Sequence, residues 1–355
     1  MDKLISDILT TRRAHNSPQE LRFVAWLRNY ITDTLKREIV TLSEGCVAVV
    51  VGKDPKTLFS CHVDTVHNAN EEPQNVFYDE NFGHIFLDKG NSNCLGADDG
   101  AGIYILLKMI EAKVPGGYIF HRGEERGGIG ANAVLKDDKD FLKKFKACIA
   151  FDRPRCDEVI ITQGGTVCAS EKYGKALAEM LNKVGGFKYA TSTRGVFTDS
   201  KVYRGVIGEC INIGVGYENQ HTPDELQDWK HLEALTKAAC TMNWDSLPFT
   251  RIPVIEQPSL GNYNSYAGNK GWQAPKKGEV QGLKQFPKSG GRHYGDGLPG
   301  FEQLTLDIDF SNMSLEEIDD IVGDKDVSNG IAGLLVNLAA EKAKVEKLYE
   351  LLGMS

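Results

Sequence analysis

The sequence predicts an α/β protein in which a mostly parallel sheet lies between two layers of helices, a three-layer α/β/α arrangement. Over residues 1–247, short apolar runs rich in β-branched residues alternate with longer segments whose apolar residues recur at helical spacing. The short runs are apolar at almost every position, which is typical of strands covered on both faces. Strands of this kind that alternate with helices favour a parallel sheet with helices on each side.

The predicted elements can be placed in order along the chain. The first helix covers residues 18–35, because Ser17 is a suitable N-cap and Pro18 is favoured at the first helical position. Further helices are predicted over residues 100–113, 169–184 and 224–243, and strands over residues 46–52, 57–63, 117–122, 147–152, 158–163 and 209–215.

The composition of the chain changes after Pro248. Residues 256–300 contain many Gly, Pro, Asn, Gln and Lys residues and show neither a helical nor a strand period. We therefore expect a folded domain at 1–247, a flexible linker or arm at 248–300, and a small helical region at 301–355. An amphipathic stretch in the last region suits a contact in a homo-oligomer or with a protein partner.

Charge and cysteine usage exclude some classes of protein. The formal net charge is −8, which argues against a general nucleic-acid binder. No apolar run approaches the ~18 residues of a membrane span, and the amphipathic N-terminus lacks the apolar segment of a secretion signal. The 8 cysteines are scattered without a C-x-x-C pair, which suits reduced thiols in the cytoplasm.

Histidine and acidic side chains stand at the predicted ends of strands and starts of helices. In a parallel sheet these positions meet at one edge, where the sites of open α/β proteins lie. Each segment alone is common as an ordinary turn or helix cap. Together they supply two imidazoles and enough carboxylates for two divalent ions and a free base. The segments are His62-Val63-Asp64, Asp98-Asp99-Gly100, Glu124-Glu125, Asp152 and His221.

The residue types suggest how the roles are divided. Side chains two apart on a strand point the same way, so Asp64 is placed to accept a hydrogen bond from His62 and fix the tautomer of a metal-binding imidazole. Adjacent carboxylates repel each other unless cations neutralise them, so Glu125 is predicted to bind metal. Glu124 then remains as the general base for the attacking water.

Asp98 and Arg153 carry two further expectations. Asp98 stands where a predicted helix begins, which favours an anion, and one carboxylate can bridge two cations because each oxygen takes one. Arg153 directly follows the strand-end residue Asp152, so it would either bind a substrate carboxylate or pair with Asp152.

These motifs resemble those of the co-catalytic zinc peptidase clan. The clan includes peptidase T, carboxypeptidase G-type and acetylornithine deacetylase-type enzymes, and the single-domain bacterial and vesicular aminopeptidases. The resemblance covers roughly residues 50–245. It rests on the runs H-V-D-T-V, G-A-D-D-G-A-G and E-E-x-G-x-x-G-A, the strand-end Asp152, and the late run H-T-P-D-E.

The resemblance implies zinc as the metal, with Co²⁺ or Mn²⁺ as alternatives. One ion would be bound by His62 and Asp152, and the other by Glu125 and His221. Asp98 would bridge the two ions.

Further roles follow from the same resemblance. Glu124 would be the general base that passes a proton to the leaving amine, and Asp64 would orient His62. Members of the clan usually have a cis peptide bond after the bridging aspartate, so we predict one between Asp98 and Asp99.

The segment after the strand-end aspartate bears on substrate binding. Thr198-Asp199-Ser200 resembles a Gly-Thr-Asp-Ser/Ala loop near the specificity pocket, so these three residues are candidate substrate contacts. Residues 153–220 are too few to hold the dimerisation or lid domain that many members insert there. The chain therefore resembles the compact single-domain aminopeptidases in architecture, although its motifs are closer to peptidase T.

The leading hypothesis is a metal-dependent hydrolase of peptide bonds, an aminopeptidase with two zinc ions. With the same metals, the substrate would instead be an N-acyl amino acid or a carboxypeptidase substrate if Arg153, Arg155 or Arg204 faced the pocket and bound a carboxylate. A hypothesis of another class is a binding or assembly protein that acts through its C-terminal tail. The presence of Glu124 argues against it, because a scaffold has no need of the base.

Overall fold

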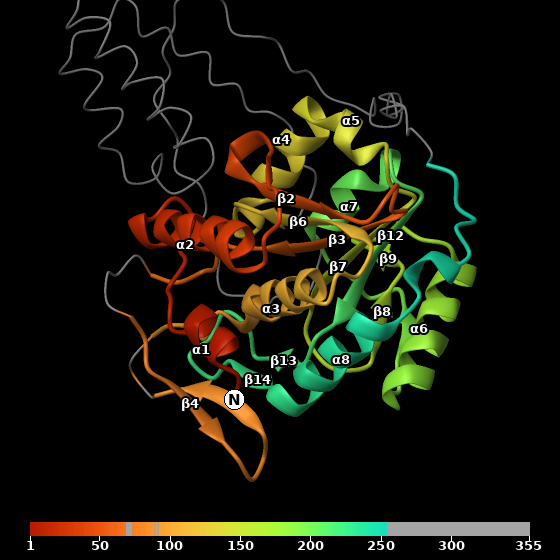
Figure 1. Ribbon diagram of the computed structural model, residues 1–355. Helices are drawn as coiled ribbons and strands as arrows, with labels where there is room; N and C mark the ends of the chain where they lie inside the picture. Colours follow the sequence, from red (N-terminus) through yellow and green to blue (C-terminus); the bar gives the residue numbers. More distant parts are fainter. Residues whose placement is uncertain (69–72, 89, 91, 254–355) are drawn as a thin grey trace, which may run out of the picture. The chain divides into compact units, whose positions relative to one another are not determined.

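An eight-stranded sheet forms the centre of the molecule (Figure 1). The structure is a computed structural model that describes residues 1–68, 73–88, 90 and 92–253. The strands of the sheet are β1 (Val40–Thr41), β2 (Val47–Val51), β3 (Thr57–His62), β6 (Gly116–His121), β7 (Ala147–Arg153), β8 (Glu158–Ile160), β11 (Ala190–Ser192) and β12 (Glu209–Gly214).

The order of these strands is β1-β2-β6-β3-β7-β12-β8-β11. Strands β6, β3, β7 and β12 run parallel to one another, and β11 runs parallel to β8. The pairings of β1 with β2, β2 with β6 and β8 with β12 are antiparallel. The predicted mostly parallel sheet is confirmed.

Helices cover both faces of this sheet (Figure 1). Alternate side chains of β3 enter different cores, because Phe59 and Cys61 pack with one helical layer and Leu58 with the other. The predicted three-layer α/β/α fold is therefore confirmed. One layer holds α1 (Lys3–Leu9), α2 (Pro18–Asn29), α3 (Ala97–Glu111), α6 (Glu171–Gly185) and α8 (Trp229–Thr241); the other holds α4 (Ile129–Asp137), α5 (Lys139–Leu142) and α7 (Asp199–Val202).

Two smaller sheets were not predicted from the sequence. A four-stranded antiparallel sheet has the order β13-β14-β5-β4, and β9 pairs with β10 as a hairpin. The strand predicted at 158–163 is divided into β8 and β9. The other strands of the two small sheets fall outside the predicted ones, because they have only two to four residues each, too few to show a clear period. The strands of the two small sheets are β4 (Val76–Asp79), β5 (His84–Leu87), β9 (Thr162–Gln163), β10 (Thr166–Val167), β13 (Tyr217–Glu218) and β14 (Leu226–Asp228).

Two predicted helices differ from those in the structure. The helix predicted at 18–35 is α-helical only to Asn29 and continues as a π-helix at Tyr30–Thr34. The helix predicted at 224–243 begins only at Trp229, because the residues just before it pair with β5 as strand β14. Asp228 caps α8 by accepting a hydrogen bond from the N–H of His231.

The chain divides into two units, Met1–Ala267 and Gly268–Ser355. The predicted linker beyond residue 253 and the predicted helical region at 301–355 lie outside the described residues. In the part of the chain that the structure describes, no helix is both long enough and apolar enough to cross a bilayer.

Ordered contacts continue past the predicted domain end at Leu247. The carboxylate of Glu209, which is 0% exposed, accepts hydrogen bonds from the N–H groups of Thr250 at 2.9 Å and Arg251 at 2.7 Å. Arg251 in turn donates to the carbonyl oxygen of Gly208 at 2.7 Å. These contacts lie where β12 begins, at the edge of the sheet opposite to its carboxyl end.

This arrangement predicts where the chain can be shortened. A chain that ends at Leu247 should be less stable than one that ends at Pro253 by about 3–6 kcal/mol, because Glu209 loses two N–H partners and each hydrogen bond to a charged group contributes about 1.5–3 kcal/mol. Urea unfolding of both shortened chains measures the difference, and equal stabilities would contradict the role of Glu209.

Candidate metal centre

Parallel strands bring the predicted site residues to one edge of the sheet. His62 is the last residue of β3, and Asp152 is the next to last residue of β7. Glu124 and Glu125 lie in a 3-10 turn that follows β6 after a two-residue link. Because these strands are neighbours and run parallel, their carboxyl ends place all four side chains at the same edge.

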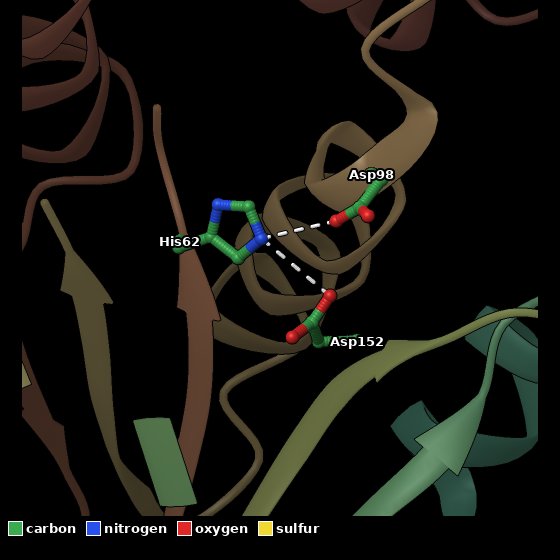
Figure 2. A group of neighbouring side chains, drawn as sticks. All are labelled: His62, Asp98 and Asp152. Carbon is green, nitrogen blue, oxygen red and sulfur yellow. Dashed lines mark hydrogen bonds and ion pairs between the residues drawn. The ribbon is translucent and has the colours of Figure 1, made fainter. Parts of the chain in front are cut away.

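His62, Asp98 and Asp152 form the first group of potential metal ligands (Figure 2). Asp98 enters this group from the first turn of α3. Nε2 of His62 lies 3.0 Å from Oδ1 of Asp98 and 3.5 Å from Oδ1 of Asp152. The group is buried, since His62 is 1% exposed and each aspartate 9%.

Asp98, Glu125 and His221 form the second group. His221 lies in the loop between β13 and β14, and its Nε2 is 3.2 Å from Oδ2 of Asp98 and 2.9 Å from Oε1 of Glu125. The two oxygens of Asp98 therefore face different histidines, as expected of a bridging carboxylate. The side chain of His221 is 45% exposed, so this second group is open to solvent.

The backbone of His221 is strained. Its φ is +66°, in the left-handed region that favours glycine. A non-glycine residue in this region costs about 1–3 kcal/mol and is seen most often where the surrounding structure serves a function. The loop therefore holds this imidazole toward Asp98 against its local preference.

The set of donors fits divalent cations. Burial raises the pKa of Asp152 to about 6, with Asp98 adding to the shift, and burial raises the pKa of Glu124 to about 10. Hydrogen bonds to Asp98 and Glu125 raise the pKa of His221 to about 10. Four carboxylates (Asp98, Glu124, Glu125 and Asp152) share this site with two imidazoles, and divalent ions would neutralise that excess of negative charge. Histidine and carboxylate donors in this proportion suit zinc and related metals.

A comparison with protein families agrees with this geometry. Residues 46–241, more than half of the chain, match the model of peptidase family M28. The chain belongs to peptidase family M28. It is a metal-dependent peptidase, and its resemblance to the co-catalytic zinc peptidase clan is confirmed.

Solved structures similar to this M28 chain share its fold. A tripeptidase from Staphylococcus aureus superposes with a TM-score of 0.53 at 14% identity, covering 67% of this chain and 95% of its own. The aminopeptidase PepT from Bacillus cereus gives a TM-score of 0.50 at 16% identity, with 67% and 96% covered. An aminopeptidase from the archaeon Desulfurococcus kamchatkensis gives 0.50 at 14%, with 67% and 93% covered. A search of curated proteins found no match.

Asp64 of this M28 peptidase contacts both halves of the site. Its main-chain carbonyl oxygen lies 2.9 Å from Nδ1 of His62; because a carbonyl only accepts, Nδ1 carries the proton and Nε2 is free for a metal. Its carboxylate accepts hydrogen bonds from the N–H groups of Gly123 at 2.7 Å, Glu124 at 3.1 Å and Glu125 at 3.2 Å. The hydrogen bond predicted for the Asp64 carboxylate is therefore made by its carbonyl, and the carboxylate holds the turn that carries the glutamates.

Asp152 is held by three residues that the sequence did not single out as its partners. Thr198 Oγ1 donates to Oδ2 of Asp152 at 2.6 Å, and the Tyr217 hydroxyl donates to Oδ1 at 3.1 Å. The side-chain oxygen of Asn212 accepts a hydrogen bond from the N–H of Asp152 at 3.0 Å, and its side-chain NH2 donates to the carbonyl oxygen of Asp152 at 2.6 Å. Partners of this kind fix the orientation of a metal ligand.

The predicted substrate contacts Thr198, Asp199 and Ser200 lie in a different place from the one expected. All three are buried, at 1%, 1% and 0% exposure, and none of them lines the pocket over the metal groups. Oδ2 of Asp199 lies 3.1 Å from Nδ1 of His121 at the end of β6, and Ser200 accepts a hydrogen bond from Gln163. Thr198 and Ser200 therefore hold two residues that do line the pocket, Asp152 and Gln163.

The loop before α3 holds Asp98 through residues far apart in the sequence. The peptide bond between Asp98 and Asp99 is cis, as predicted. Asp99 accepts a hydrogen bond from the N–H of His62 at 3.2 Å. The buried carboxylate of Glu225 accepts from N–H groups within residues 95–98, at 2.8, 3.0 and 3.0 Å. The final Glu of the H-T-P-D-E run was the only sequence signal for this contact.

Arg153 lines the pocket but is already paired. Its guanidinium donates to Oε2 of Glu158 at 2.9 and 2.7 Å, and Arg194 binds the other oxygen of Glu158 at 2.8 Å. Glu158 is 3% exposed. The predicted pairing of Arg153 with Asp152 is wrong, because the guanidinium bonds to Glu158 instead.

Proposed function

We propose that this M28 peptidase is an aminopeptidase that uses two zinc ions. The observation that carries the proposal is the position of Asp98, whose two carboxylate oxygens face His62 and His221 separately at 3.0 and 3.2 Å. His62 and Asp152 would hold one ion with Asp98, and Glu125 and His221 the other. Co²⁺ or Mn²⁺ would fit the same donors.

The side chains then have distinct tasks. When bound, divalent ions supply Lewis acidity, which lowers the pKa of water and polarises the scissile carbonyl. Glu124 lines the same pocket as the ligands and is held by its main-chain N–H on the Asp64 carboxylate. Glu124 takes a proton from the attacking water and returns it to the departing nitrogen.

Recognition of an amine rather than a carboxylate is supported by the charges around the pocket. Among the described residues that line it, Arg153 is the only arginine or lysine, and its guanidinium is bonded to Glu158. Four carboxylates line the same pocket: Asp98, Glu124, Glu125 and Asp152. Two zinc ions would balance these four charges, so the choice of substrate depends on Arg153. Its donors are already bonded to Glu158, which leaves no free arginine or lysine among the described lining residues for a substrate carboxylate. This favours an aminopeptidase over a deacylase or a carboxypeptidase.

A matched pair of substrates tests this choice. Alanyl- and leucyl-p-nitroanilide should be hydrolysed at least about 100-fold faster than their N-acetylated forms, because acetylation removes the ammonium charge and a site built for a polar group rejects analogues that lack it. Release of amino acid from N-acetyl-leucine, or of the C-terminal residue from an N-blocked dipeptide, provides the comparison. Faster turnover of either blocked substrate would favour the deacylase or carboxypeptidase and sink the aminopeptidase proposal.

We also infer a cytoplasmic location, because none of the 8 cysteines forms a disulfide. An oligomer or partner contact through the helical pattern at 301–355 remains a prediction, since that region lies outside the described residues.

A further inference from the structure

Arg13 is a buried cation that comes from outside the family match. It is 0% exposed, and the match to peptidase family M28 begins only at residue 46. Within the described part of the chain, its guanidinium hydrogen-bonds to main-chain carbonyl oxygens and to no carboxylate. These are four hydrogen bonds for the five N–H donors of the guanidinium. A buried charge needs such partners, so each carbonyl that it binds is held in place in return.

The guanidinium joins two of the three segments that carry the first group of ligands, those of His62 and Asp98. Its Nε donates to the carbonyl oxygen of Val63 at 2.8 Å, and Val63 directly follows His62. Its Nη2 donates to the carbonyl oxygen of Gly96 at 2.9 Å, and Gly96 stands two residues before Asp98. One rigid, planar group thus spans the end of β3 and the start of α3.

Arg13 is itself anchored from behind. Its Nη1 donates to the carbonyl oxygens of Ile8 at 2.6 Å and Thr11 at 3.1 Å, at the end of α1. Its own carbonyl accepts the N–H of Thr65 at 2.9 Å. The N-terminal segment therefore fixes the guanidinium from one side while the guanidinium fixes the ligand segments on the other.

Gly96, in the loop before Asp98, is held by two side chains of opposite charge, Glu225 and Arg13. The N–H of Gly96 donates to Glu225 at 3.0 Å, while its carbonyl accepts from Arg13 at 2.9 Å. Glu225 also accepts the N–H of Asp98 itself at 3.0 Å. Glu225 makes no hydrogen bond to Val63 among the described residues. The Arg13 guanidinium therefore joins this loop to the end of β3, beside the hydrogen bond from the His62 N–H to Asp99.

We propose that Arg13 is a positioning residue of the metal centre, which sets the spacing between His62 and Asp98 and thereby raises the affinity for zinc. The inference rests on the proposed zinc site. Lysine does not replace arginine here, because a single ammonium group does not reach the Val63 and Gly96 carbonyls in the directions that the planar fork provides.

The test is the affinity of the purified full chain for Zn²⁺, measured by competition with a chelator, for the wild type and Arg13→Lys. We expect the substitution to weaken binding by about 10- to 100-fold, the size of effect found when a partner that orients a metal ligand is removed. Arg251→Lys is the matched control, because Arg251 also binds main-chain carbonyls but at the opposite edge of the sheet. Its zinc affinity should equal that of the wild type.

The outcomes separate this inference from the proposed function. A wild type that binds no zinc would refute the two-zinc proposal itself. If the wild type binds zinc and folded Arg13→Lys binds it with an affinity within twofold of the wild type, that result would overturn only the role of Arg13. Lowered stability with unchanged affinity would do the same, since it would make Arg13 an ordinary structural residue.

A second measurement does not depend on the variant being folded. Hydrogen exchange of the wild-type chain should slow on zinc binding at the N–H of Thr65, which is bonded to Arg13. Exchange there that is unchanged by zinc, while the N–H groups of Glu124 and Glu125 become protected, would overturn the proposed coupling.

Discussion

Replacing Glu124 with glutamine is expected to reduce turnover by about 10²- to 10⁴-fold, the usual contribution of a general base. The zinc content should stay that of the wild type, because Glu124 belongs to neither ligand group. The amide keeps the shape of the side chain, and the main-chain hydrogen bond to Asp64 is unaffected by the substitution. What is lost is the ability to accept a proton from water and return it to the leaving nitrogen.

The measurement combines steady-state turnover of a free-amine substrate with metal analysis of the same sample. Glu218→Gln is the matched control, because Glu218 is an exposed glutamate of β13 that takes no part in the site. Its turnover should equal that of the wild type. Near-normal turnover in Glu124→Gln would refute the assignment of the base, and a loss of zinc together with turnover would show that Glu124 acts on the ligands instead.

The residues that meet at the metal centre were predictable because their signals are local. His62 and Asp152 each stand at the end of an apolar run. At predicted turns, Asp98 follows the small residues Gly96 and Ala97, and Glu125 follows a second acid, Glu124. A parallel sheet brings such positions to one edge, so the pattern of strands and acids was enough to group them. His221 was predicted because it follows the strand predicted at 209–215, which is β12 in the structure.

The contacts that hold these ligands were not predictable from local patterns. Glu225 reaches the loop at 95–98, and Thr198 reaches Asp152, across long stretches of chain that only the finished fold brings together. The same holds for Arg13, which stands in a polar N-terminal run without a motif. For Asp64 the residue was predicted but not its bonds, because the turn after β6 supplies N–H groups that compete for the carboxylate.

Substitutions of three ligands are expected to give different zinc contents if Asp98 is the bridge. His62 belongs only to the first group and His221 only to the second, whereas Asp98 belongs to both. His62→Ala and His221→Ala should therefore each retain one of the two zinc ions, and Asp98→Asn should retain neither. Each affinity should fall by more than the about 10- to 100-fold caused by losing an orienting partner, because a ligand itself is removed.

Plasma mass spectrometry on protein purified without added metal, and again after dialysis against zinc, measures these contents. His231→Ala is the control, since His231 is a half-buried histidine bonded to Tyr189 outside both groups. Burial separates the two histidines further, because His62 is 1% exposed and His221 45%. In the metal-free protein, His62→Ala should therefore leave the larger cavity and lower the unfolding midpoint more than His221→Ala does. Loss of both ions in His221→Ala alone would mean that the open group is needed to load the buried one. Retention of one ion in Asp98→Asn would mean that the two groups bind independently, and the bridging role of Asp98 would then be wrong.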